Sequence, residues 1–261
     1  MPHVHVIISA NQDRPVFSEP EIIRDTFIAF ERVASEGATI SAYALMSAHA
    51  HLLLGAEDPA EVGSVMARIL APLARNINGR LKQHGGVFRH PYWRGVVRSA
   101  SHLYILPLYI HANPSPHATT LARLDVGLRS SHAAWMSGDA PDFLRPRAAL
   151  DQYAGDYPAA MQAFLDDRAA APVAGALAEG PEQYTILAVA RATGTRPATL
   201  LDSARGGKRD RMLLAWALGE EFGNAAAARI LGVERHTIGR WARAVAVDDT
   251  FGPSRARLGP A

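Results

Sequence analysis

The order of strand-like and helix-like segments in the first 113 residues constrains the fold of this chain most. Stretches rich in β-branched and apolar residues predict strands at 3–9, 39–46 and 49–55, and a short strand within 87–97. Apolar side chains at helical spacing predict helices over 18–35, 58–82 and 99–113. The resulting order, βαββαβα, contains a split βαβ unit. We therefore expect an α+β fold in which a ferredoxin-like sheet carries its helices on one face.

The pattern changes beyond residue 124. Residues 125–180 are rich in Ala, Pro and Asp with short helical pieces, and residues 181–246 are helical again. The last residues contain Gly, Pro and Arg, a composition typical of a loose terminus. We expect a first domain over 1–124, a helical extension or linker over 125–180, an all-α domain over 181–246 and a flexible tail over 247–261.

The formal net charge of +2 conceals a segregation of charge along the chain. Residues 1–61 carry 3 basic and 9 acidic side chains, whereas residues 62–124 carry 8 basic side chains and no acidic ones. A second basic block, residues 183–245, carries 10 basic and 5 acidic side chains. Because 25 of the 27 cations are Arg, whose guanidinium suits bidentate contact with phosphate, these blocks favour a nucleic-acid partner over an ordinary solvated face.

Composition excludes several classes of protein. With 48% hydrophobic and 20% charged residues the chain can bury a core, which excludes global disorder. The absence of Cys excludes disulfides, Cys-ligated zinc, iron–sulfur clusters and thiol nucleophiles. Neither a secretory signal nor an apolar run of about 18 residues is present, so we expect no membrane partner and a cytoplasmic, nucleoid-associated location.

Two histidines in the third predicted strand are candidate metal ligands. His49 and His51 are two residues apart, so both imidazoles project from one face of the strand and a divalent cation can bind both. His3 and His5 repeat the spacing near the N-terminus. A pair of this kind by itself is more often a surface or core pair.

Tyr109 and Asn113 add to this pair. They lie four residues apart in a predicted helix and therefore share one face. We interpret Asn113 as a third ligand and Tyr109 as a nucleophile. Two imidazoles and an amide leave about three positions open on an octahedral ion, which suits Mg²⁺ or Mn²⁺ in contact with a phosphate. The plain structural alternative is that Tyr109 packs in the core and Asn113 ends the helix before Pro114.

These residues resemble the motifs of the REP-associated tyrosine transposases, within the IS200-like, HUH-type Y1 transposase superfamily. The matching stretches occur in order over about residues 3–168. They are His5-Val6, Pro15-Val16-Phe17, Ala42 to Met46, His49 to Leu54, Arg94-Gly95, Tyr109 to Pro114, and Ser130-Ser131 with Trp135.

The resemblance implies a DNA transposase, that is, a metal-dependent single-strand DNA endonuclease and strand transferase with its catalytic domain over 1–124. It implies that His49, His51 and Asn113 hold Mg²⁺ or Mn²⁺, and that Tyr109 attacks a DNA phosphate to leave a 5′-phosphotyrosine. Single-stranded or hairpin DNA is then expected to bind the first basic block. The protein is expected to act as a monomer or a homodimer. The expected contacts are Arg75, Arg80, Lys82, Arg89, Tyr92, Trp93, Arg94 and Arg98.

Several residues depart from the family pattern. A larger hydrophobe usually stands where Ala50 is, and Pro-Asn usually precedes the first histidine where Ser47-Ala48 stands here. Pro107 removes a helical hydrogen bond just before Tyr109. These departures favour an alternative, a captured and catalytically impaired transposase that acts as a DNA-binding regulator. A plasmid relaxase or rolling-circle initiator is a further alternative, and Tyr104 is a rival nucleophile without an Asn four residues later.

The segment Ala226–Ala244 has the pattern of a helix-turn-helix. A small residue, Ala228, precedes Gly232 by four positions, and Val233, Ile238 and Trp241 occupy the expected buried positions. We expect duplex DNA binding, with base edges read at the start of the second helix and phosphates bound further along. The expected contacts are Arg235, His236 and Thr237 for bases, and Arg240 and Arg243 for phosphates. The alternative is a helical hairpin that only packs.

Overall fold

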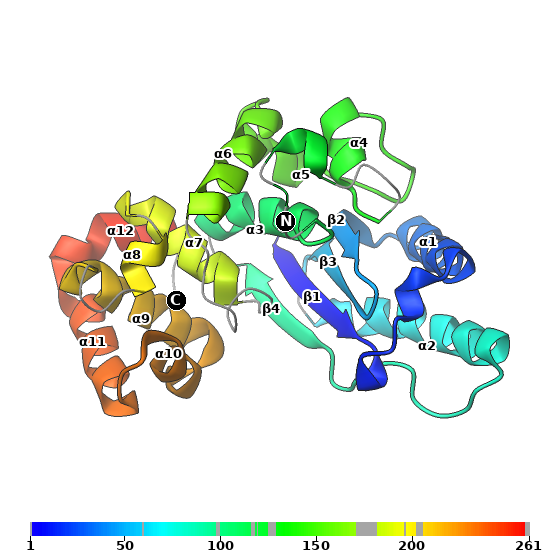
Figure 1. The fold of residues 1–261 in the computed structure, drawn as a ribbon, viewed down its shortest axis with the longest axis horizontal. Coiled ribbons are helices and arrows are strands. Elements are labelled where there is room, and N and C mark those ends of the chain that lie inside the picture. The colour runs from blue at the N-terminus through cyan, green and yellow to red at the C-terminus, as the bar shows by residue number, and fades with distance from the viewer. Residues whose placement is uncertain are drawn as a thin grey trace. The chain divides into compact units, whose positions relative to one another are not determined.

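Two compact units make up the computed structural model of the chain (Figure 1). It describes residues 2–58, 60–97, 100–115, 118, 120–124, 129–170, 182–195, 197–201 and 206–258. The N-terminal unit comprises Met1–Val97 and Pro107–Met161, and the C-terminal unit comprises Arg98–Leu106 and Gln162–Ala261. The chain therefore passes between the units at 97/98, at 106/107 within a helix and at 161/162, and not at the boundary expected at residue 124.

A four-stranded antiparallel sheet forms the centre of the N-terminal unit. Its strands are β1 (His3–Ser9), β2 (Thr39–Leu45), β3 (His49–Gly55) and β4 (Trp93–Val97), in the order β2-β3-β1-β4. Because β3 lies between β1 and β2, the sheet has the split βαβ order that the sequence predicts. The α+β class is confirmed.

Helices cover both faces of this sheet, which corrects the expectation of helices on one face. Phe27 and Phe30 of α1 (Pro20–Ser35) pack on Tyr43. Tyr43 of β2 and Val6 of β1 both pair with Leu52 of β3, so the three side chains lie on the same face of the sheet. Helix α2 (Glu61–Leu81) packs beside α1. The opposite face carries α3 (Ala100–Ala112). The physical reason is that successive side chains of β1 and β3 point to opposite faces of the sheet and most of them are buried. Neither face is therefore left to solvent.

Helix α3 runs through Pro107 and belongs to both units. Its first half clusters with the C-terminal unit, where the guanidinium of Arg191 lies 3.7 Å from the Tyr104 ring centre. Its second half belongs to the N-terminal unit together with α4 (His132–Ser137), α5 (Arg147–Leu150) and the start of α6 (Tyr157–Ala170). Short 3₁₀ turns lie at Asn11–Asp13, Val16–Ser18, Leu121–Arg123, Asp151–Tyr153 and Asp249–Phe251.

The C-terminal unit is helical around α9. Its helices are α7 (Glu182–Thr193), α8 (Pro197–Leu201), α9 (Lys208–Phe222), α10 (Asn224–Leu231), α11 (Arg235–Val247) and α12 (Gly252–Leu258). Helices α10 and α11 both pack on α9. The segment expected to be a flexible tail instead includes α12, whose Leu258 is buried, as is Phe251 before it. None of the described helices is long and apolar enough to cross a membrane.

Candidate active site and nucleic-acid interface

Histidines from two neighbouring strands meet on the sheet face beneath α3. His49 and His51 lie on this face as the spacing predicts, with ring centres 5.3 Å apart. The register of β1 against β3 pairs Ile7 with His51 and so places His5 diagonally across from His51. The His5 and His51 rings are stacked 5.1 Å apart, and His5 Nε2 lies 2.9 Å from His51 Nδ1.

Tyr109 of α3 packs against these histidines. Its ring centre lies 5.5 Å from that of His51 and 6.4 Å from that of His5, edge-on to both. Trp93 of β4 completes the group, 5.2 Å from His5. The fold thus brings together Tyr109, His51 and His49, as the sequence predicts, and adds His5. The His3-X-His5 spacing was a signal for His5, but its contact with His51 depends on the strand register.

Burial keeps His5 and His51 neutral. His5 is fully buried, which lowers its pKa from 6.5 to about 3. The pKa of His51 is also well below its ordinary value, because of burial first and the neighbouring His5 and His49 second. A neutral imidazole is the form that binds a metal.

Tyr109 is itself covered. Its side chain is only 2% exposed, so a DNA phosphate does not reach the phenol in this conformation. It nevertheless faces the histidines, and not a purely apolar core. His49 is half-buried and forms the accessible margin of the group.

His51 has one buried ring nitrogen that suits a divalent cation. His51 Nε2 is buried without a hydrogen-bond partner among the described residues, so its lone pair is available if His51 Nδ1–H donates to His5. Across those same residues, no three His, Cys, Asp or Glu side chains come together in a metal-binding group. A third protein ligand would therefore be the Asn113 amide. Its nitrogen donates to the Tyr109 carbonyl at 3.0 Å, which leaves its oxygen outside that bond.

Much of the first basic block pairs with acids of the protein itself. Arg80 makes a bidentate ion pair with Asp25, at 2.9 and 3.1 Å, and this bond raises the Arg80 pKa. Arg89 pairs with Asp13 at 2.7 Å, and Arg68 pairs with an acid of the first segment in the same way. The segregation of charge in the sequence is therefore partly internal complementarity, because α2 packs beside α1.

The remaining candidates of this block differ in exposure. Arg75, Lys82 and Arg94 are exposed and form no ion pair with any residue that the structure describes. Tyr92 and Trp93 are half-buried. Arg98 lies outside the described residues.

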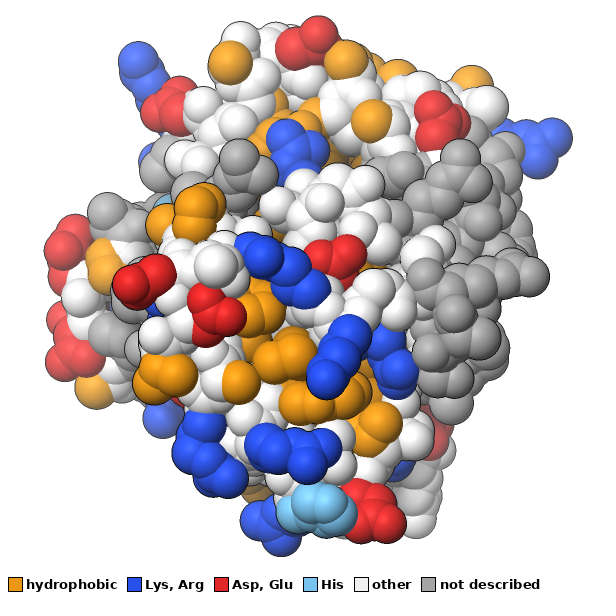
Figure 2. Space-filling model, turned by 90° about the vertical axis from the view of Figure 1, so that its left-hand side faces the viewer, with side chains coloured by type: hydrophobic (Ala, Val, Ile, Leu, Met, Phe, Trp, Pro, Cys, Tyr) orange, Lys and Arg blue, Asp and Glu red, His pale blue; other side chains and the backbone are white. Residues whose placement is uncertain are grey.

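The second helix of the C-terminal pair, α11, presents cations on its exposed side. Ile238 and Val245 are buried, whereas Arg235, Arg240 and Arg243 are exposed. Figure 2 shows Lys and Arg side chains gathered on one face of the molecule, with a histidine beside an acid.

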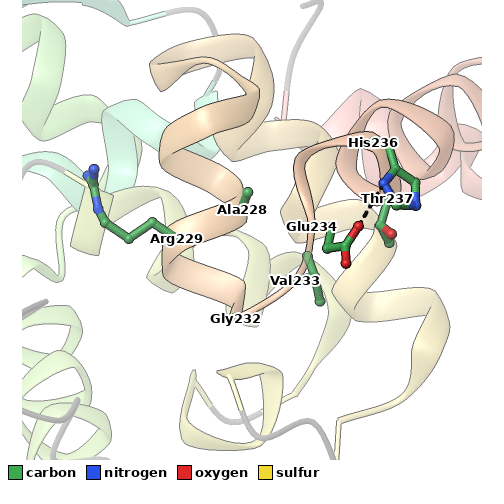
Figure 3. Close-up of a pocket in the computed structure, with 7 residues that line it drawn as sticks. All are labelled: Ala228, Arg229, Gly232, Val233, Glu234, His236 and Thr237. Carbon is green, nitrogen blue, oxygen red and sulfur yellow. Dashed lines mark ion pairs between the residues drawn. The ribbon is translucent and has the colours of Figure 1, made fainter.

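A hollow lies at the turn between α10 and α11 (Figure 3). Gly232 makes the turn at φ +62°, and Thr237 and the exposed His236 line the hollow. Glu234 is not among the contacts that the sequence predicts, and its Oε2 lies 3.0 Å from His236 Nδ1. Two helices joined by a turn lie where the pattern predicts them, and Ile238 is buried as expected, whereas Val233 and Trp241 are only half-buried. That this pair is a helix-turn-helix, and that it binds DNA, both stay predictions.

Comparisons with known proteins identify few relatives. No family model matches the chain, and no curated protein matches it. Among solved structures, it is similar to a chain described as the REP associates tyrosine transposase bound to a REP hairpin. The two are 14% identical, the similarity covers 55% of this chain and 85% of that one, and the TM-score is 0.41. At this level the similarity assigns no family, and function is inferred below from the residues themselves.

Proposed function

We propose that this chain is a DNA transposase, a metal-dependent single-strand DNA endonuclease and strand transferase that uses Tyr109. The observation that supports this most is the packing of Tyr109 against the histidines. Its ring centre lies 5.5 Å from that of His51, and the ring centres of His51 and His49 lie 5.3 Å apart. A phenol beside a pair of imidazoles on one sheet face combines a nucleophile with metal ligands. Tyr104 is the weaker choice, because Leu108 and not an Asn stands four residues after it.

The proposed reaction is a reversible transesterification. The Tyr109 phenol releases its proton to water, and its oxygen attacks the phosphorus of a single-stranded DNA linkage. The bond to the 3′ oxygen breaks, and that oxygen takes a proton to become a 3′-hydroxyl while the phosphate stays on Tyr109 as a 5′-phosphotyrosine. Attack by a 3′-hydroxyl reverses the step and joins strands. His49, His51 and Asn113 would hold Mg²⁺ or Mn²⁺, which would supply Lewis-acid stabilisation of the phosphate charge.

The reaction requires that Tyr109 be uncovered first. With the phenol 2% exposed, the side chains that cover it must move aside before a phosphate can enter, while α3 keeps Tyr109 beside His51. We assign the half-buried His49 to the entry side. Arg75, Lys82 and Arg94, which form no ion pair with the described residues, would bind single-stranded DNA together with the half-buried Trp93.

The C-terminal pair of helices would bind duplex DNA. Arg235, His236 and Thr237 stand at the start of α11, where a recognition helix reads base edges, and Arg240 and Arg243 are exposed further along for phosphates. This would hold the enzyme at the nucleoid.

A second function is favoured by the burial of Tyr109. If Tyr109 stays covered, the same chain is a DNA-binding regulator that has kept the fold of a transposase and lost its reaction. Ala50 between the histidines and Pro107 within α3 are consistent with such a change.

Covalent capture separates the two functions. The protein is incubated with pooled single-stranded genomic fragments that contain hairpins, with Mg²⁺ or Mn²⁺, and resolved on a denaturing gel. The transposase predicts a DNA adduct that is absent in Tyr109→Phe and His49→Ala and present in the matched control Tyr104→Phe. Duplex binding without any adduct, across a fragment pool covering the source genome, supports the regulator.

A further inference from the structure

The side of α3 that faces away from the histidines carries a buried chain of hydrogen bonds. His111 is fully buried two residues after Tyr109, and two residues turn a helix by about 200°. Its Nε2 lies 2.6 Å from Ser131 Oγ and its Nδ1 lies 2.6 Å from the Tyr157 hydroxyl. The same hydroxyl lies 2.8 Å from His132 Nδ1.

The series of hydrogen bonds begins at the backbone of strand β2. The Tyr43 N–H of β2 donates to Ser131 Oγ at 2.9 Å, and the Ser131 N–H donates to the Tyr43 carbonyl at 3.0 Å. Ser131 is thereby fixed to the edge of β2. Both nitrogens of His111 are therefore tied, one to the sheet through Ser131 and the other to α6 through Tyr157.

The hydrogens can be arranged so that every donor has an acceptor. The Ser131 hydroxyl donates to His111 Nε2, His111 Nδ1–H donates to the Tyr157 oxygen, and the Tyr157 hydroxyl donates to His132 Nδ1. None of these polar atoms is among the buried ones that lack a partner. A buried network satisfied in this way favours one arrangement of its members, because any slip leaves polar groups unpaired.

We propose that His111, Ser131 and Tyr157 position the nucleophile: they set the rotation of the last turns of α3 and so hold Tyr109 against His51. This rests on the proposed function of Tyr109. Rotation of α3 about its axis would break both His111 bonds and carry the Tyr109 ring away from His51. Trp135 also helps to fix the rotation of α3. Its ring centre lies 4.9 Å from that of His111, and its Nε1–H donates to the Ser41 carbonyl at 3.1 Å.

Tyr157→Phe tests the proposal, because it removes only the hydroxyl and keeps the ring that packs on Trp135. We expect the single-turnover rate of adduct formation to fall about 10- to 100-fold with unchanged affinity for single-stranded DNA. Tyr43→Phe is the matched control. Its side chain is equally buried but packs against α1 on the opposite face, so both rate and affinity should stay at the wild-type values.

A measurement independent of activity separates this proposal from the proposed function. Nitration by tetranitromethane, located by peptide mass spectrometry, reports whether the Tyr109 phenol is covered. We expect protection in the wild type and in Tyr43→Phe, and reaction of Tyr109 in Tyr157→Phe.

Each outcome decides one of the two claims. Protection of Tyr109 or an unchanged adduct rate in Tyr157→Phe would overturn the positioning role. Absence of any wild-type adduct would overturn the transposase and leave nitration to decide the positioning. Should Tyr157→Phe not fold, Ser131→Ala cuts the same chain at its other end and is expected to give the same two results.

Discussion

Acid should unfold the N-terminal unit in a pH range set by its buried histidines. His5, His51 and His111 are all fully buried, and burial lowers the pKa of each, to about 3 for His5. In the unfolded chain they return to the ordinary value of 6.5. Between these values the unfolded state binds more protons than the folded one. The stability is therefore complete above pH 6.5 and is lost as the pH falls toward the folded-state pKa.

The magnitude follows from the ordinary pKa. At pH 5 each histidine that is neutral when folded and protonated when unfolded costs about 2 kcal/mol, so the three together cost about 6 kcal/mol. His132, whose pKa is lowered to about 4, acts in the same direction. A loss of this size is comparable to the whole stability of a typical domain of about 5–15 kcal/mol.

Urea unfolding at pH 7, 6 and 5 measures this loss. His5→Gln, which can still bond to His51, should make the decline between pH 7 and pH 5 smaller by about 2 kcal/mol. The matched control is the exposed His84→Gln, which should follow the wild type. A free energy of unfolding that is the same at pH 7 and pH 5 would refute the reasoning, as would a His5→Gln decline identical to that of the wild type.

Three further predictions concern the C-terminal unit. Gly232→Ala places a side chain at φ +62° and should lower the stability measured by thermal unfolding by about 1 kcal/mol; an unchanged midpoint would contradict it. Arg211→Met removes the buried guanidinium that donates to the Leu231 carbonyl at 3.0 Å and should cost about 1–3 kcal/mol in urea unfolding, whereas a neutral result would show that the bond is dispensable. Arg240→Ala and Arg243→Ala should each weaken duplex binding and reduce the slope of log affinity against log salt by about 0.9, and a constant slope would remove these residues from the interface.

Local sequence patterns were sufficient to predict strand β3, helix α3 and the placement of His49 and His51 on one face of the sheet. The apolar stretch at residues 49–55 predicts a strand, and β3 spans these residues. Because side chains alternate along a strand, the pairing of His49 with His51 on one face follows from spacing alone. Helix α3 likewise lies within the predicted 99–113.

Contacts between distant residues were beyond the reach of these patterns. The place of His5 beside His51 depends on the register of β1 against β3, which no local rule specifies. The ion pair of Arg80 with Asp25 joins residues of opposite charge blocks, so a stretch without acids gave no sign that its cations were already paired. The burial of Tyr109 depends on how α3 packs on the sheet, and the contact of Tyr109 with His51 joins residues 58 positions apart in the sequence.

The most direct measurement is to locate the DNA on the protein. Digestion of the denatured adduct followed by mass spectrometry identifies the residue that carries the nucleotide. The account predicts a phosphodiester on Tyr109, formed only with Mg²⁺ or Mn²⁺ and absent in His51→Ala. A nucleotide on Tyr104, or an adduct that persists in Tyr109→Phe, would contradict it.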